Sequence, residues 1–302
     1  VNFTEEKVML DSIEQMFNYY ATLDEPDERK AFYANIDAYS NKAAEYAIPN
    51  EYDKMISMLG GKGLNAYTTE DRTVYTVDMP SNEIPRFLEL EGSRFKKIVN
   101  RLFHTELEAV YEEKNRSLDN DRWKVFEAMY SKMFQNHPYG TQTVIGTIEH
   151  LKNPSITEIK NYFNTYYRPN NVAVCMSGDI DYSKTIKLID QYFGDWEPNV
   201  ELPTWTKVEE EPITEPLVAE VYGPDAEFLQ MGFRFGGTSS DDYIMVQLVD
   251  MLLNNSEAGL IDLNLKQQQA VLNAGSYVDN MNDYSIHTIY GNAKQNQSLK
   301  RE

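Results

Sequence analysis

The sequence has little cysteine, little basic charge and no long apolar run, and each shortage excludes a class of protein. Its single cysteine, Cys175, rules out an internal disulfide, and its apolar neighbours predict a buried, unreactive thiol. With 48 acidic and 28 basic residues the net charge is -20, which repels phosphate backbones, so no nucleic-acid partner is expected. Because no run of about eighteen or more apolar residues occurs, no membrane span is predicted.

The length of the chain and its first residues limit its organisation. It has 302 residues, 41% of them hydrophobic, which is enough for two domains with separate apolar cores. It starts at Val1 with neither an initiator methionine nor the basic-then-apolar plan of a secretory signal. We therefore expect the chain to begin inside a gene or after processing. One free thiol fits either side of a bacterial inner membrane, so cysteine usage leaves the compartment open.

Apolar spacing predicts that the chain opens with helices. Apolar residues recur at helical spacing over residues 5–46, which predicts a hairpin of two helices. The break between them is expected near Pro26, because proline disfavours helix in the residue before it. A short helix at 50–59 is expected to end at Gly60, since glycine adopts the left-handed backbone that stops a helix. β-Branched and aromatic residues then predict strand structure over 65–79.

The remaining pattern predicts one mixed domain, a linker and the start of another domain. The expected elements of the first domain are helices at 84–100, 104–135 and 155–167, a strand at 171–177 and a helix at 184–192. Those of the second are strands at 217–222 and 230–235, a helix at 241–253 and a strand at 285–291. We accordingly divide the chain into an α+β domain at 1–197, a proline-rich acidic linker at 198–216 and a truncated second domain at 217–302.

The two predicted domains open differently. The second opens with a strand followed by a helix, whereas the first opens on helices with no strand before them. If the two domains are duplicates, the first has lost its opening strand and helix.

The main candidate for chemistry is a pair of glutamates in one predicted helix. Glu106 and Glu113 are nearly two helical turns apart, so they project from the same face. Two stacked carboxylates could ligate a cation or set one another's protonation. A solvated acidic face has the same spacing and is common, so the pattern alone does not decide between these interpretations.

Histidine patterns and nucleophile motifs give no further candidate. None of the four histidines has a partner at a two-ligand spacing; they are His104, His137, His150 and His287. His104 and Glu108 are four residues apart and could bind a metal ion together, although a pair of side chains on the protein surface is the favoured interpretation. His137 precedes a Pro-Tyr-Gly turn, where a hydrogen-bonding role is expected. No nucleophile elbow and no glycine-rich phosphate loop occurs, which excludes nucleotide chemistry.

Several short segments, each weak alone, follow one another in a specific order. They are Gly60-Gly61, the string Leu64-Asn65-Ala66-Tyr67-Thr68-Thr69-Glu70-Asp71-Arg72-Thr73-Val74-Tyr75, the helix Glu106 to Glu113, His137-Pro138-Tyr139-Gly140 with Ile145-Gly146 and Glu149, Tyr166-Tyr167-Arg168-Pro169-Asn170-Asn171, and Ser177-Gly178-Asp179. The ordered set resembles the pitrilysin/insulinase family of zinc metallopeptidases, which includes the mitochondrial processing peptidases.

The resemblance implies a fold and a site. The fold is α+β, with duplicated α/β-sandwich domains that pair into half of a clamshell; the first would lack its opening strand and helix, and the second would be incomplete. Glu113 would be the third zinc ligand, and Glu106 a second acidic residue that supports catalysis. The strand residues Leu64, Asn65, Ala66 and Tyr67 would form the sheet edge to which a peptide substrate adds as an extra β-strand.

The sequence departs from the family at one decisive place. The family's His-x-x-Glu-His helix, which supplies two zinc ligands and the general base, does not precede the helical hairpin. We therefore expect a zinc metalloendopeptidase as the parent protein, and a chain that by itself holds no tightly bound zinc and has no peptidase activity. The alternative is a non-catalytic peptide-binding or scaffold subunit of the same family.

The resemblance also implies partners and a compartment. The expected partners are a peptide substrate and a carboxy-terminal half or partner subunit of the same family. Related bacterial enzymes of this layout are often exported, which favours the bacterial periplasm or cell envelope over the cytoplasm.

Overall fold

The structure is a computed structural model that describes residues 2–294, and these fall into two compact units. The first unit takes the chain up to residue 67 together with 73–112 and 147–205, and the second takes 68–72, 113–146 and the chain from 206 onward. The two units interleave along the chain, so the predicted boundaries at 197 and 217 remain a prediction.

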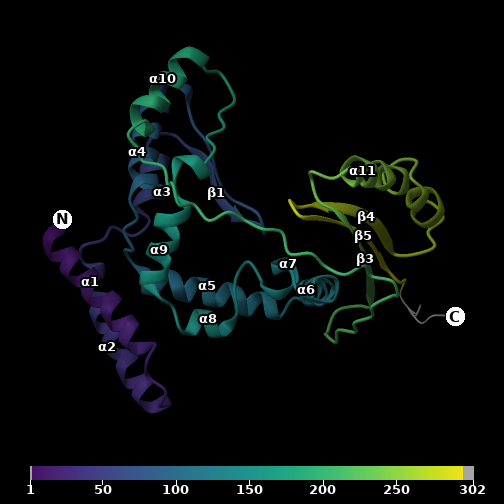
Figure 1. The fold of residues 1–302 in the computed structure, drawn as a ribbon, viewed down its shortest axis with the longest axis horizontal. Helices are drawn as coiled ribbons and strands as arrows, with labels where there is room; N and C mark the ends of the chain where they lie inside the picture. The colour runs from purple at the N-terminus through teal and green to yellow at the C-terminus, as the bar shows by residue number, and fades with distance from the viewer. Residues whose placement is uncertain (1, 295–302) are drawn as a thin grey trace. The chain divides into compact units, whose positions relative to one another are not determined.

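The first unit opens with the predicted helical hairpin, which the structure confirms (Figure 1). Helix α1 (Phe3–Tyr20) is followed by α2 (Pro26–Ala44), whose first residue is the proline that needs no backbone donor there. A shared apolar core joins this hairpin to α9 (Ile156–Tyr166); its buried members are Ile13, Phe17, Ile36, Ala43 and Ile156. The apolar spacing of the sequence thus produces a packed seam between helices.

A small sheet forms the middle of the first unit. Helix α3 (Glu51–Met58) ends before Gly60, whose φ of +80° is the left-handed conformation expected of a terminating glycine. Strands β1 (Lys62–Thr68) and β2 (Thr73–Asp78) then pair with each other in a two-stranded sheet. The predicted strand region at 65–79 is therefore a hairpin.

Two helices lie close together in the same unit. After η1 (Ser81–Glu83), α4 (Ile84–Lys96) packs against α10 (Tyr182–Phe193). A Cβ atom at Gly92 would stand 2.6 Å from the carbonyl oxygen of Tyr192, so only glycine permits this approach of the two helices.

The strand predicted at 171–177 is wrong in this structure. After η2 (Pro169–Asn171), residues 172–177 run without strand pairing. The β-forming residues are present, but the sheet of this unit contains only β1 and β2, so no neighbouring strand pairs with them. Cys175 lies in this segment and is exposed, which corrects the expectation of a buried thiol.

The single helix predicted at 104–135 is two helices, α5 (Phe103–Leu118) and α6 (Asp121–Met133). Between them, Asn120 accepts a 3.1 Å hydrogen bond from the backbone nitrogen of Trp123 and so caps the start of α6. Two short helices follow, α7 (Pro138–Thr141) and α8 (Ile148–Lys152).

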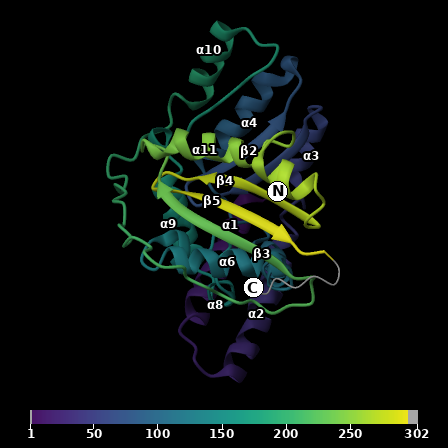
Figure 2. The ribbon, with the colours of Figure 1, turned by 90° about the vertical axis from the view of Figure 1, so that its right-hand side faces the viewer.

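The second unit is built on a three-stranded antiparallel sheet (Figure 2). Its elements are β3 (Phe228–Gly236), α11 (Asp242–Leu253), the π-helical turn η3 (Asp262–Lys266), β4 (Asn273–Asn280) and β5 (Tyr284–Asn292). Strand β5 lies between β3 and β4, and α11 packs along one face of the sheet. The strand predicted at 217–222 is not formed, and β4 was not predicted.

The core of the second unit joins the helix α6 to the sheet. Its buried members are Tyr130, Met133, Phe134, Tyr139, Met281, Tyr284 and Ile286. Within residues 2–294, none of the helices combines the length and apolarity needed to cross a bilayer.

Candidate functional site

The four residues predicted to bind a peptide backbone all lie on β1. This strand pairs with β2 on one side only, so within the described chain its other edge has no strand neighbour. Asn65, Ala66 and Tyr67 are exposed, and Leu64 is half-buried. The Asn65 side chain accepts a 2.9 Å hydrogen bond from the backbone nitrogen of Ala66. The strand therefore has an open edge of the kind that accepts an added strand, although a peptide that pairs with Ala66 must displace the Asn65 side chain from its backbone nitrogen.

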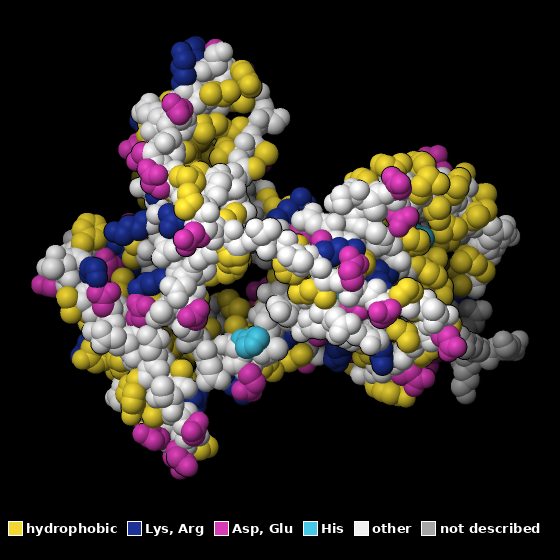
Figure 3. Space-filling model, in the orientation of Figure 1, with side chains coloured by type: hydrophobic (Ala, Val, Ile, Leu, Met, Phe, Trp, Pro, Cys, Tyr) yellow, Lys and Arg dark blue, Asp and Glu magenta, His cyan; other side chains and the backbone are white. Residues whose placement is uncertain are grey.

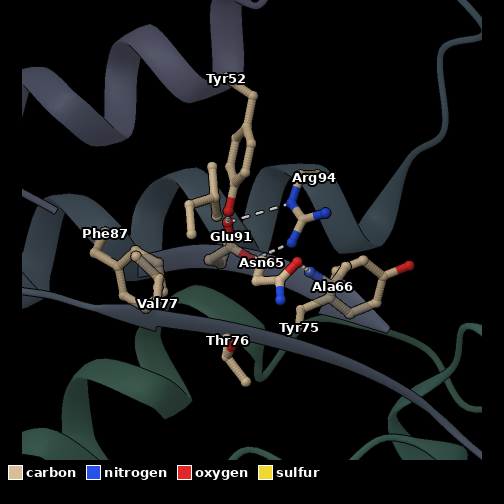
Figure 4. A pocket seen from close by; sticks show the side chains of 10 residues that line it. Tyr52, Asn65, Ala66, Tyr75, Thr76, Val77, Phe87, Glu91 and Arg94 are labelled. Carbon is tan, nitrogen blue, oxygen red and sulfur yellow. Dashed lines mark hydrogen bonds and ion pairs between the residues drawn. The ribbon is translucent and has the colours of Figure 1, made fainter. Parts of the chain in front are cut away.

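A cavity of about 300 Å³ brings three of these four residues together (Figure 4). Leu64, Asn65 and Ala66 line it, whereas Tyr67 does not. Its other walls come from α3, β2 and α4; the residues are Tyr52, Tyr75, Thr76, Val77, Phe87, Glu91 and Arg94.

An ion pair with a tyrosine partner forms the polar wall of this cavity, and sequence reasoning missed it. Glu91 is buried and accepts a 2.6 Å hydrogen bond from Tyr52 Oη and another of 2.6 Å from Arg94 Nη2. The guanidinium carbon of Arg94 lies 4.5 Å from the ring centre of Tyr52 and 4.8 Å from that of Tyr75. The three groups thus connect α3, α4 and β2.

Tyr52 and Arg94 keep their protons at neutral pH. Burial raises the pKa of Tyr52, and its hydrogen bond to Glu91 adds to the effect, so the hydroxyl stays protonated. Burial alone would lower the pKa of Arg94, but the hydrogen bond and charge of Glu91 outweigh it and raise that pKa. The only hint in the sequence was the three-residue spacing of Glu91 and Arg94 on a predicted helix.

The two predicted acidic site residues lie on α5 and are both exposed. Within residues 2–294 neither the Glu106 carboxylate nor the Glu113 carboxylate makes a hydrogen bond or an ion pair. In that range no group of three His, Cys, Asp or Glu side chains could hold a metal ion. Because a catalytic zinc site needs three protein ligands, these two carboxylates do not fit a complete site by themselves. Their assigned roles remain predictions.

His104 takes part in a polar cluster between α2 and α5. Its Nε2 atom lies 3.3 Å from a carboxylate oxygen of Asp37 and 3.3 Å from one of Glu108. Its Nδ1 atom lies 3.2 Å from Tyr33 Oη. Burial, followed by the charge of Glu108, raises the pKa of Tyr33 to about 12. The expected surface pair is correct for Glu108, which is exposed, but not for His104, which is buried and joins α5 to α2.

His137 is fully buried in the second unit and makes the hydrogen bonds expected of it. Its Nδ1 atom accepts a 3.2 Å bond from the backbone nitrogen of Tyr139, and Nε2 lies 3.1 Å from Asp283 Oδ2. Tyr139 Oη in turn donates to Asp71 at 2.7 Å. His137 and Tyr139 of the His-Pro-Tyr-Gly segment therefore hold the turns that contain Asp71 and Asp283 in place, which is a structural role.

Comparison with known families assigns most of the chain. The family model described as Insulinase (Peptidase family M16) matches residues 38–146, and the one described as Peptidase M16 inactive domain matches residues 155–302. Zinc protease PqqE of Helicobacter pylori is 23% identical over 271 residues, which cover 86% of this chain and 61% of that protein.

Two solved structures show the same fold. A protease from Helicobacter pylori has a TM-score of 0.72 at 22% identity, covering 82% of this chain and 61% of its own. The periplasmic protease PqqL from Escherichia coli has a TM-score of 0.57 at 16% identity, covering 81% of this chain and 28% of its own. The predicted α+β fold class is thereby confirmed, and the chain spans less than two thirds of each of these proteins.

Proposed function

The chain belongs to the M16 family of pitrilysin/insulinase-type peptidases, and on that premise we propose that its parent protein is a zinc-dependent endopeptidase that holds peptides as an added β-strand. The observation that supports the proposal is the edge of β1 that has no strand neighbour in the described chain, where Leu64, Asn65 and Ala66 line a cavity. An extended peptide would pair with this edge through its backbone. Selectivity for sequence would then come from the walls of the cavity.

The proposal gives the acidic helix a role in the parent protein only. Glu113 would supply one zinc ligand, and Glu106 would support the site from the same helix. Both carboxylates are exposed and without partners in the described chain, so they are free to take up such contacts. Because two carboxylates do not complete a catalytic zinc site, the chain alone holds no tightly bound zinc and hydrolyses no peptide.

The second candidate function is a non-catalytic peptide-binding or scaffold subunit. It is favoured by the match of residues 155–302 to a domain described as inactive. In both candidates we propose that the chain works with a carboxy-terminal half or a partner subunit of the same family. PqqL is described as periplasmic, which supports a place in the cell envelope for this protein as well.

Peptide binding at β1 can be tested with one position and two substitutions. Ala66→Pro removes a backbone donor from the strand, whereas Ala66→Val keeps the donor and favours strand structure. We expect fluorescence anisotropy with a labelled unstructured peptide to show binding weakened about tenfold or more by proline, and unchanged by valine. Equal binding by the two variants, with unchanged circular dichroism, would contradict the proposed edge.

The predicted lack of activity has a separate test. An internally quenched peptide incubated with the chain and added zinc should stay uncleaved. Metal analysis after dialysis should find no stoichiometric zinc. Cleavage that a chelator abolishes would show that the chain carries a complete site.

A further inference from the structure

The polar wall of the cavity beside β1 has hydrogen-bond donors left over. Glu91 is engaged by three donors: Oε1 accepts from Tyr52 Oη at 2.6 Å and from Arg94 Nε at 3.2 Å, and Oε2 accepts from Arg94 Nη2 at 2.6 Å. Within residues 2–294 the remaining nitrogen of Arg94, Nη1, makes no hydrogen bond. A guanidinium carries only donors, so a ligand group that reaches this wall is matched best if it accepts.

The orientation of the Arg94 side chain is restricted by its neighbours. Because Nε and Nη2 form the edge of the guanidinium that faces Glu91, Nη1 points away from that carboxylate (Figure 4). The guanidinium carbon also lies 4.5 Å from the ring centre of Tyr52, 4.8 Å from that of Tyr75 and 4.7 Å from that of Phe95. Three rings and an ion pair thus hold a free donor in one direction.

The rest of the cavity is mainly apolar and aromatic. Its lining includes the side chains of Leu64, Ala66, Val77 and Phe87 and the rings of Tyr52 and Tyr75. A volume of about 300 Å³ is at the small end of ligand pockets, which fits one side chain better than a stretch of peptide. Aromatic walls favour an aromatic guest, since rings attract one another in edge-to-face and offset arrangements.

The position of the cavity beside β1 determines which peptide residues can enter it. Side chains directly opposite one another on paired strands lie on the same face of a sheet, and successive side chains point to opposite faces. Leu64 and Ala66 both line the cavity. A peptide residue paired with either of them therefore directs its side chain to the face where the cavity lies, whereas its two neighbours point away.

From these observations we infer that the cavity is a specificity pocket for one tyrosine of the bound peptide, whose ring packs between the aromatic walls and whose hydroxyl accepts a hydrogen bond from Arg94 Nη1. The inference rests on the proposed function, because the peptide must first pair with β1. Backbone pairing repeats along a strand and leaves the register open. The anchored tyrosine would therefore also set the register of the peptide.

Two similar guests fit this pocket less well. Phenylalanine has the same ring, but it would cover Arg94 Nη1 without accepting from it, and a donor that loses water without gaining a partner costs free energy. Glutamate can accept, but it brings a second negative charge close to Glu91 in a chain whose net charge is already -20. It also lacks a ring to pack against Tyr52 and Tyr75.

Four capped peptides test the pocket. They share one neutral, unstructured sequence and carry tyrosine, phenylalanine, glutamate or alanine at the central position. Fluorescence anisotropy should show that the tyrosine peptide binds tightest. The phenylalanine peptide should bind about tenfold more weakly, because it loses one hydrogen bond from a charged donor. The glutamate and alanine peptides should bind more weakly still.

Three variants of the chain separate the two features of the pocket. Arg94→Lys keeps a positive charge beside Glu91 but has no planar fork with a free nitrogen, so the tyrosine and phenylalanine peptides should bind equally and both better than alanine. Leu64→Trp fills the cavity and should bring the Kd values of the tyrosine and alanine peptides within about twofold of each other. Met58→Trp adds the same ring to α3 at a position that is 87% exposed and does not line the cavity, and the ranking should persist.

The results distinguish a wrong pocket from a wrong edge. Equal binding of the four peptides by the unsubstituted chain, or a tyrosine preference that survives Leu64→Trp, would overturn the inference. If Ala66→Pro still weakens binding in that case, pairing at β1 stands and only the pocket is wrong. Binding that Ala66→Pro leaves unchanged would contradict the proposed function, and this inference with it.

Discussion

Tyr139 donates a 2.7 Å hydrogen bond from its side chain to a carboxylate oxygen of Asp71, and the other oxygen of Asp71 accepts a 2.8 Å bond from the backbone nitrogen of Asn282. One carboxylate thus joins the β1–β2 turn to the turn between β4 and β5, within the second unit. Burial raises the pKa of Tyr139, so the donor stays protonated at neutral pH.

Removing this hydroxyl should destabilise the protein. Tyr139→Phe leaves a carboxylate with one partner fewer, and we expect the free energy of unfolding to fall by roughly 1.5–3 kcal/mol. Urea denaturation followed by circular dichroism measures the change. Tyr182→Phe, at a tyrosine with 76% of its surface exposed, is the control and should change stability by less than about 0.5 kcal/mol.

The buried ion pair beside β1 should matter more than a similar exposed pair. Glu91→Gln removes the charge that Arg94 faces, and the expected loss of stability is roughly 1.5–3 kcal/mol. Glu83 pairs with Arg86 at the same three-residue spacing, but the Arg86 side chain is 72% exposed. Glu83→Gln should therefore cost less than about 1 kcal/mol, and similar losses in the two variants would contradict the role of Glu91.

Asp279 predicts a pH dependence. Burial raises the pKa of its carboxyl despite the hydrogen bond from Tyr130, and the charge of Glu70 adds to the increase. A folded pKa above the unfolded value favours the protonated native state, so this stabilisation is complete below the unfolded pKa and is lost as pH rises through the folded pKa. Asp279→Asn should therefore be more stable than the parent chain at about pH 7 and lose that advantage near pH 3.

The measurement is the urea midpoint of the two proteins across this pH range. An advantage that grows toward acid pH would have the wrong sign and would show that the hydrogen bond from Tyr130 dominates.

The outer face of α11 should make the protein self-associate. Hydrophobic side chains gather over this helix (Figure 3), with Met245 61% and Leu252 69% exposed. Exposed apolar surface of this kind promotes association. Leu252→Lys should lower the average mass seen by light scattering at high protein concentration. Lys132→Leu, a change of the reverse sense on α6, should not lower it.

The local elements of the fold could be predicted because their causes are local. Pro26 starts a helix and Gly60 ends one through their own backbone preferences, and apolar spacing defined the two helices of the hairpin. The break between α5 and α6 at Asn120 was not predicted, because the apolar periodicity continues across it. The start of α6 is marked only by the side chain of Asn120, which caps the helix. Strand β4 was missed because it begins Asn-Ala-Gly-Ser, and its pairing with β5 forms only in the folded sheet.

The site was predictable in part for the same reason. The ordered motifs placed Leu64 to Tyr67 on a strand, and the structure confirms that strand. Tyr52, Glu91 and Arg94 come from separate elements, so their meeting depends on packing that spacing does not contain. The functions of Glu106 and Glu113 stay predictions, since the described chain supplies no third ligand beside them.

Gly92 has no side chain, and this allows α4 to lie close to α10 beside a second cavity, along β2. Helices α4 and α10 both contribute walls to that space, and their backbones approach where the glycine lies. A methyl group there would stand 2.6 Å from the carbonyl oxygen of Tyr192 and would force the two helices apart. The close packing of α4 on α10 therefore depends on a position that has room for a hydrogen atom and for no carbon.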